Sequence, residues 1–472
     1  MTGGRTMLDL QLSGSAMLAR LAARQCDARQ WLNETWKGRE WADALNAFLP
    51  LDLDAKAQAT ASDARRESGR AGPLEGLLVS IKDNVALDGS PTTGSSPLLQ
   101  DYRVPGGPVI ARLRDSGAIF VGKTNLHELA FGITGDNAFT GPVLNPFDHT
   151  RVAGGSSSGA AISVATGACA VAIVTDTGGS ARVPAAFCGI AGFRPTTGRY
   201  PASGYLPLSP SRDTIGVLAR HVEDIREVDA VLTDERSKAR TAGLAGVRLG
   251  VVRATPMDPA IAHRFEQILS TLTAVGVELV PVDITPAIAA DDACGFLIAV
   301  YETARSMETL AKEALGLTLA EFADGIASPD VRTLIASQAT PDAIRPNAYR
   351  DAIEIQLPRL QKAYAGLLSG VDALIHPTAP VIAPRIGQSM VDVGGTTMPA
   401  FPACSMLTRP DSMAGLPSIS LPAGLVNDMP IGIQLTGKPG QDAALLALAE
   451  DVERALPPRP IAAPHHAAAR EN

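Results

Sequence analysis

Three polar side chains with reactive atoms stand at the ends of apolar or glycine-rich segments. Ser156 lies in the string GGSSSG at residues 154–159, Ser180 ends the string TGGS at residues 177–180, and Lys82 ends an apolar run. A serine hydroxyl needs a base to become a nucleophile, and a lysine that burial keeps neutral can be that base. Glycines lack a Cβ, so their backbone N–H groups can converge on a developing oxyanion. These residues indicate acyl transfer through a serine.

Each of these pieces also has a simpler interpretation. A glycine- and serine-rich string is typical of a flexible linker, and a lysine at the end of an apolar run can extend its ammonium group to solvent. A linker, however, does not normally continue into an apolar run such as residues 160–174, which has almost no bulky side chain. Residues 151–186 are therefore predicted to form a loop, a buried helix, a strand and a second loop.

Other catalytic arrangements find little support. The chain has seven histidines, and none accompanies a Gly-x-Ser-x-Gly turn between a strand and a helix. The string GSSSG at residues 155–159 fits that pattern, but its predicted flanking elements are in the wrong order. No histidine pair has the spacing of zinc ligands, and no Gly-x-Gly-x-x-Gly opens a dinucleotide fold. The sequence predicts no metal and no cofactor.

The composition is that of a folded α/β enzyme. Of 472 residues, 46% are hydrophobic, 19% are charged and only 4% are aromatic, so Ala, Val, Leu and Ile must build the interior. The net charge of −8 and the absence of a dense Lys/Arg block disfavour nucleic-acid binding. No apolar run reaches the ~18 residues of a membrane span. The five scattered cysteines favour reduced thiols and a cytoplasmic protein.

The elements that must position the three side chains alternate between strands and helices. Strands are predicted at residues 76–82, 118–121, 246–252, 277–282, 371–377, 416–421 and 429–435, and helices at 7–24, 109–116, 222–232, 259–275 and 443–456. Residues 294–365 have an almost wholly helical pattern. This order predicts a single large α/β domain with a central mixed sheet covered by helices on both faces. We divide it into an N-terminal helical segment (1–70), a core (71–235) and the remainder of the same domain (236–472).

Lys82 and the two strings together resemble the amidase signature family. Ser156 and Ser180 are 24 positions apart, which is the spacing of that family. The resemblance extends over residues 74–219 and again over 415–441. Ser158 and Ala160 stand where many members have Gly and Ser, which affects the following helix and not the reactive positions.

The resemblance implies a role for each site residue. Ser180 is the expected nucleophile, Ser156 the bridging serine after a cis peptide bond, and Lys82 the neutral general base. The expected oxyanion hole consists of backbone N–H groups. Of the supporting residues, Ser157 is expected to hydrogen-bond the lysine, and Asp176 and Arg182 are expected to brace the loop, with structural salt bridges as the equal alternative for these two. The oxyanion residues are Thr177, Gly178, Gly179 and Ser180, and the supporting residues are Ser157, Asp176 and Arg182.

The resemblance also implies a substrate class. Residues 122–132, 191–201 and 211–216 look most like bacterial indoleacetamide and mandelamide hydrolases, which release ammonia from a linear arylacetamide. We therefore expect a small-molecule amide such as indole-3-acetamide or mandelamide as the substrate. Phe131, Gly132 and Ile133 are candidate lining residues of the acyl pocket, with core packing as the alternative.

Several alternatives stay open at this stage. The same chemistry could act on another amide, an anilide, a carbamate or a ureido compound. An A subunit of a tRNA-dependent amidotransferase usually has Gln after the arginine of the nucleophile segment, whereas this chain has Val183. A non-catalytic binding relative is expected to have lost Lys82, Ser156 or Ser180, and all three are present. For partners we expect neither nucleic acid nor membrane, and we consider a homodimer.

Overall fold

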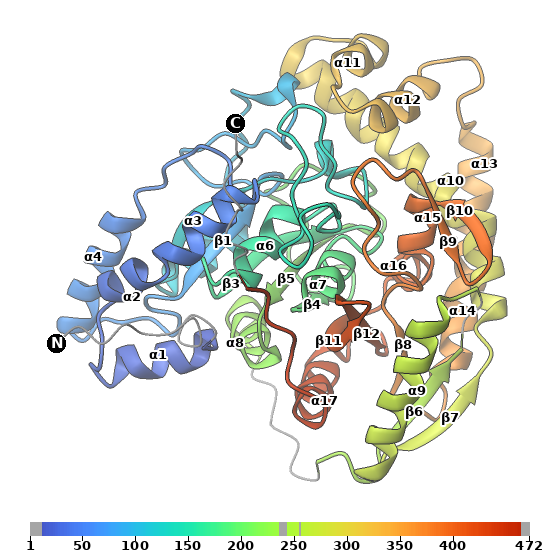
Figure 1. Ribbon diagram of the computed structural model, residues 1–472. Helices are drawn as coiled ribbons and strands as arrows, with labels where there is room; N and C mark the ends of the chain where they lie inside the picture. Colours follow the sequence, from blue (N-terminus) through green and yellow to red (C-terminus); the bar gives the residue numbers. More distant parts are fainter. Residues whose placement is uncertain (1–11, 236–242, 254–255, 464–472) are drawn as a thin grey trace, which may run out of the picture.

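A ten-stranded mixed sheet forms the centre of the protein. The computed structural model describes residues 12–235, 243–253 and 256–463 (Figure 1). Across the sheet the strands follow the order β2-β1-β3-β5-β4-β11-β12-β8-β6-β7. They are β1 (Leu78–Lys82), β2 (Ile119–Thr124), β3 (Val171–Asp176), β4 (Ala191–Arg194), β5 (Thr214–Ala219), β6 (Arg248–Val252), β7 (Glu278–Val282), β8 (Ala373–Pro377), β11 (Ser418–Val426) and β12 (Met429–Thr436). A separate hairpin pairs β9 (Met390–Val393) with β10 (Thr396–Pro399).

The strand directions change at the middle of the sheet. β1 runs parallel to β2 and β3, and β6 runs parallel to β7 and β8. The strands between these two groups are joined in antiparallel pairs, from β3 through β5, β4, β11 and β12 to β8. β11 and β12 form a hairpin whose two turn residues, Asn427 and Asp428, have φ of 49° and 61°. Asn and Asp tolerate this left-handed conformation, so the turn suits a two-residue hairpin.

Helices cover both faces of the sheet. Helices that contact its strands include α6 (Ser158–Ala165), α7 (Arg182–Cys188), α8 (Val222–Thr233), α9 (Pro259–Ala274) and α17 (Asp442–Ala455), and α5 (Pro108–Asp115) packs against α8. α6 and α7 contact each other, while α8 contacts α17. The N-terminal helices α1 (Gly14–Ala22), α2 (Ala28–Glu34), α3 (Trp36–Ala44) and α4 (Ala55–Glu67) lie together at one side (Figure 1).

A second group of helices lies at the opposite side of the molecule (Figure 1). It consists of α10 (Thr285–Leu310), α11 (Leu319–Gly325), α12 (Pro329–Ser337), α13 (Pro346–Asp351) and α14 (Leu357–Leu367), with short π-helical turns at Ala311–Leu315 and Ala352–Gln356. Two further short helices, α15 (Ala400–Ser405) and α16 (Arg409–Met413), lie beside this group. α10 contacts α16, so residues more than a hundred positions apart share one wall.

Helix α6 is short, made of small residues and completely buried. It packs against β1, β2, β3 and β5. Gly159 permits this close approach, because a Cβ at that position would lie 2.2 Å from the carbonyl oxygen of Ala47. The small side chains thus hold the start of α6, and the serines before it, directly against the sheet.

The predicted architecture is confirmed: the chain forms one α/β domain around a mixed sheet with helices on both faces. The second strand is longer than predicted and ends at Thr124, because residues 122–124 stay paired with β1. The N-terminal helix was predicted over residues 7–24, of which residues 7–11 lie outside the described part. Within the described part, no helix is long and apolar enough to cross a membrane.

Candidate active site

Lys82 is the last residue of β1 and lies in the interior of the sheet, where its side chain is fully buried. Its Nζ donates to Ser156 Oγ at 2.8 Å and to Thr175 Oγ1 at 2.9 Å. Thr175 belongs to the neighbouring strand β3, and its Oγ1 also accepts from Asn84 Nδ2 at 3.0 Å. The pairing of β1 with β3 therefore places the lysine beside Thr175, and the turn before α6 brings the hydroxyl of Ser156 to the same Nζ.

The environment of Lys82 favours its neutral form. Burial lowers the pKa of this lysine to about 7, although the carboxylates of Asp176 and Asp213 act in the opposite direction. Desolvation outweighs the attraction because neither carboxylate forms an ion pair with the ammonium group within the described residues. A lysine with this pKa is partly unprotonated at neutral pH and can accept a proton.

Ser156 lies directly before α6, and the peptide bond between Gly155 and Ser156 is cis. The carbonyl oxygen of Ser156 accepts from the N–H of His127 at 3.1 Å, which ties this turn to the loop after β2. The structure differs from the expectation for Ser157. Its hydroxyl donates to the carbonyl oxygen of Thr175 at 3.4 Å, and the hydroxyl of Thr175 occupies the place beside the lysine that Ser157 was expected to take.

Ser180 follows the end of β3 in a loop that is organised by Asp176. The Asp176 carboxylate accepts from the N–H groups of Gly179 at 2.9 Å and Ala181 at 3.1 Å. Gly179 was expected to contribute its N–H to the oxyanion hole, but the structure directs that N–H to Asp176 Oδ1. Within the described residues, the N–H groups of Thr177, Gly178 and Ser180 donate to no other protein atom. Three of the four expected donors are therefore available for an oxyanion.

Asp176 and Arg182 form a fully buried ionic cluster behind the loop. Arg182 Nε donates to Asp176 Oδ2 at 3.0 Å, and its Nη1 donates to both oxygens of Asp411 at 2.9 Å. Burial alone would raise the pKa of Asp176, but Arg182 and Arg194 hold it well below its usual range. Arg182 thus joins the nucleophile loop to α16, which is far away in the sequence. The two expected roles of Asp176 and Arg182, bracing the loop and forming structural salt bridges, therefore coincide, because these salt bridges are what holds the loop in place.

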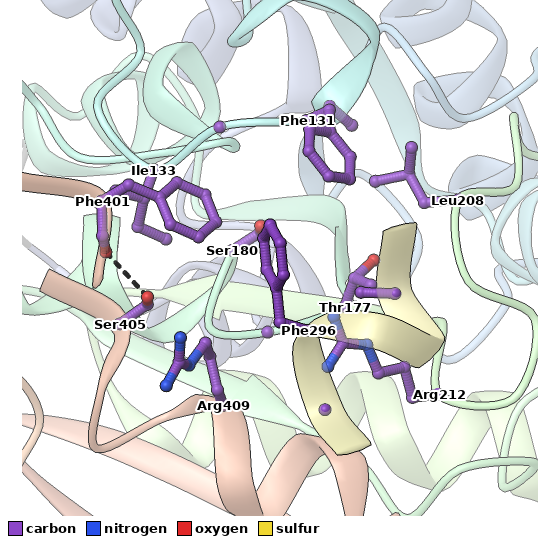
Figure 2. Close-up of a pocket in the computed structure, with 15 residues that line it drawn as sticks. Phe131, Ile133, Thr177, Ser180, Leu208, Arg212, Phe296, Phe401, Ser405 and Arg409 are labelled. Atoms are coloured by element: carbon purple, nitrogen blue, oxygen red, sulfur yellow. Dashed lines mark hydrogen bonds between the residues drawn. The ribbon is translucent and has the colours of Figure 1, made fainter. Parts of the chain in front are cut away.

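Ser180 opens onto a pocket of about 550 Å³, including the space open to solvent. Only 7% of the surface of Ser180 is exposed. The candidate lining residues Phe131, Gly132 and Ile133 all border this pocket, with Thr177 and Gly178 beside Ser180. In Figure 2, Ser180 lies at the middle of the view between the aromatic part of the pocket and two arginines.

Sequence reasoning missed the outer wall of the pocket. The missed lining residues come from distant segments, and they are Leu208, Arg212, Gly295, Phe296, Ala299, Phe401, Ser405 and Arg409. Phe296 and Phe401 are both exposed, unlike most phenylalanines of the chain. Only 11 residues are Phe, so a single Phe is a weak signal, and no spacing connects Phe296 or Phe401 to Ser180. Thr175 was also missed; it is the second-to-last residue of β3, which pairs with β1.

Across residues 12–235, 243–253 and 256–463, no cluster of three His, Cys, Asp or Glu side chains could hold a metal ion.

Comparisons with known proteins agree with the fold. The profile of the Amidase family matches residues 37–446, and the chain therefore belongs to the amidase family. An indoleacetamide hydrolase of Allorhizobium ampelinum is 35% identical over 449 residues, covering 93% of this chain and 96% of the relative. A mandelamide hydrolase of Pseudomonas putida is 36% identical over 474 residues, covering 95% and 92%. A crystal structure titled as an amidase matches with a TM-score of 0.86 and 33% identity, covering 94% of this chain and all of the other.

These findings define the class of protein. The chain is a hydrolase of amide C–N bonds in the amidase signature family, as the resemblance implied.

Proposed function

We propose that this protein hydrolyses a small arylacetamide, such as indole-3-acetamide or mandelamide, to a carboxylate and ammonia. The observation that carries the proposal is the hydrogen bond between buried Lys82 and Ser156, next to a pocket that Ser180 lines. A neutral lysine held against a serine can draw a proton through that serine from the nucleophile.

The proposed acylation begins with attack of Ser180 Oγ on the amide carbonyl carbon. The Ser180 proton passes to Ser156 Oγ as the Ser156 proton passes to Lys82 Nζ. Backbone N–H groups of Thr177, Gly178 and Ser180 stabilise the negative oxygen, and preorganised donors of this kind give a large part of the rate enhancement. When the C–N bond breaks, Lys82 returns its proton through Ser156, and ammonia leaves.

The second half of the reaction reverses these roles. Water attacks the acyl-enzyme on Ser180, and its proton follows the same path through Ser156 to Lys82. The proton then returns to Ser180 Oγ as the carboxylic acid leaves, and the acid loses its remaining proton to solvent to give the carboxylate. Thr175 contributes by accepting from Lys82 at 2.9 Å, which keeps the Nζ oriented between the two hydroxyl groups.

The lining of the pocket supports an acyl group with an aromatic ring. Phe131, Ile133, Phe296 and Phe401 surround the space above Ser180 (Figure 2), and rings prefer such offset or edge-on aromatic contacts. The two relatives named as indoleacetamide hydrolase and mandelamide hydrolase cover nearly the whole chain. Other amides, anilides, carbamates and ureido compounds are the competing substrates for the same chemistry.

The test is release of ammonia or amine by the wild type and by Ser180→Ala over one panel. The panel contains indole-3-acetamide, mandelamide, phenylacetamide, aliphatic amides, an anilide, a carbamate and a ureido compound. We expect the highest kcat/KM for an arylacetamide and no turnover by Ser180→Ala. A higher kcat/KM for one of the other classes would replace the proposed substrate, while activity of Ser180→Ala would remove the mechanism.

A further inference from the structure

One end of the Ser180 pocket carries charged side chains that the proposed mechanism does not use. Arg212, from the loop before β5, and Arg409, the first residue of α16, both line the pocket. The two guanidinium groups lie on the opposite side of Ser180 from Phe131 and Ile133 (Figure 2). Asp291 of α10 is buried next to them and contacts Arg409.

Arg212 is a buried cation without a direct counter-ion. It is 6% exposed, and among the described residues no carboxylate oxygen lies within 4.0 Å of its guanidinium group. Among the described residues, its Nη1 donates a hydrogen bond only to Met413 Sδ, at 3.8 Å, and its Nε has no hydrogen-bond partner. A guanidinium group cannot lose its proton, so burying it without an anion is costly.

Of the three carboxylates that act on Arg212 through space, Asp213 and Glu302 are engaged elsewhere. Asp213 accepts from Thr177 Oγ1 at 2.6 Å and from the N–H groups of Leu208 and Ser209. Glu302 accepts from Ser209, Ser211 and Tyr349. Neither of them bonds to Arg212, and Asp291, which acts on Arg212 most strongly of the three, also lies beyond 4.0 Å within the described residues. The donors of Arg212 are left for a group inside the pocket.

Arg409 is also incompletely paired. Its Nη2 lies 3.5 Å from Asp291 Oδ2 and 3.9 Å from Asp292 Oδ1, longer than charge-assisted hydrogen bonds, which are about 2.7–2.9 Å. Its Nε and Asp291 Oδ1 have no hydrogen-bond partner. Gly295, which lines the pocket, leaves this corner open, because a Cβ there would lie 2.1 Å from Asp291 Oδ1.

We propose that Arg212 and Arg409 form a subsite for a carboxylate on the acyl group of the substrate. The inference rests on the proposed function and adds a preference for arylacetamides that carry a carboxylate. The apolar residues contact the ring, and the two guanidinium groups bind the carboxylate. Planar guanidinium donors match a carboxylate better than any neutral acceptor.

The test compares carboxylated phenylacetamides with uncharged counterparts of the same shape. Phenylacetamide with a carboxylate at the 2-, 3- or 4-position is assayed beside the nitro compound substituted at the same position. A hydrogen bond to a charged group contributes enough to predict a kcat/KM about 10-fold or more above the nitro counterpart for at least one position. In Arg409→Gln and Arg212→Gln this ratio should fall toward one.

Arg253→Gln is the matched control, because Arg253 pairs with Glu266 on the surface and does not line the pocket. It should keep the wild-type ratio. Arg212→Gln could disturb folding, whereas Arg409 is partly exposed, so Arg409→Gln decides the point when the two variants disagree. No carboxylate preference at any position, or a preference that survives in Arg409→Gln, would overturn the subsite.

A binding measurement separates this inference from the proposed function. In the Ser180→Ala variant, calorimetry should show about 10-fold tighter binding of the preferred carboxylated amide than of its nitro counterpart. If the wild type hydrolyses none of these amides, the proposed function fails and calorimetry alone decides the subsite. If it hydrolyses the nitro compounds equally well and calorimetry shows no difference, only the subsite fails.

Discussion

Lys82 Nζ lies 2.8 Å from Ser156 Oγ, and both side chains are fully buried. Strand β1 supplies the lysine and the turn before α6 supplies the serine, so the contact depends on how α6 packs on β1. A charged lysine in this place would lose its hydration without gaining a direct ion pair, and its pKa is accordingly lowered to about 7. The proposed chemistry follows from this one contact.

Replacing the nucleophile should abolish turnover. We expect Ser180→Ala to lower kcat by a factor on the order of a million, as for nucleophiles that act within a catalytic unit. Ammonia release under saturating amide measures the effect. Ser158→Ala is the matched control, since Ser158 is also buried near the site but its Oγ has no hydrogen-bond partner. Comparable losses in the two variants would point to damage of the loop instead of loss of a nucleophile.

The activity should depend on pH through Lys82. Because the lowered pKa is about 7, the neutral base predominates above that pH and is lost as the pH falls. We expect kcat/KM to decline by about tenfold per pH unit well below pH 7. Lys82→Arg should be inactive at every pH, since its side chain stays protonated. A flat wild-type profile down to pH 5, with the fold intact by circular dichroism, would contradict a neutral lysine base.

The cluster behind the nucleophile loop should matter for stability. Arg182→Met leaves the buried carboxylates of Asp176 and Asp411 without their shared cation. Breaking a buried pair in this way costs about 3–5 kcal/mol, and urea unfolding measures it. Arg253→Met removes an exposed ion pair and should change the free energy of unfolding by about 0.5 kcal/mol or less. Equal unfolding midpoints for Arg182→Met and wild type would refute this role.

Phe296 should contribute to binding of the aromatic acyl group. It borders the pocket although its own surface is 55% exposed. We expect Phe296→Ala to raise KM for an arylacetamide about 3- to 10-fold, the range of one aromatic contact, with a smaller effect on kcat. Phe139→Ala is the control, because Phe139 is similarly exposed at 43% and does not line this pocket. An unchanged KM in Phe296→Ala would place the ring of the substrate elsewhere.

The sequence alone was sufficient for the architecture and for the choice of Lys82, Ser156 and Ser180 as candidates. Periodicity and turn residues mark the strands, and the two glycine-rich strings stand out because they flank a buried helix. The sequence could not show that Asp176 captures the N–H of Gly179, because that depends on the path of the loop. Likewise, Thr175, and not Ser157, hydrogen-bonds the lysine because β3 pairs with β1. No local sequence pattern reveals this pairing of strands.

The outer wall of the pocket lay beyond sequence reasoning for a different reason. Phe296, Phe401 and Arg409 are separated from Ser180 by more than a hundred residues, and the contact of α10 with α16 brings the elements of Phe296 and Arg409 together. Their types are common in surfaces and cores alike. Nothing in a single sequence distinguishes them from packing residues until the tertiary contacts are known.

The two walls of the pocket have separate origins in the chain. Lys82, Ser156 and Ser180 come from the first 180 residues, whereas Phe296, Phe401 and Arg409 come from helices more than a hundred residues further along the sequence. A change in the later helices can therefore alter which acyl group fits without touching the proton path. In this fold the substrate range can therefore diverge, by natural selection or by directed evolution, while the catalytic chemistry stays the same.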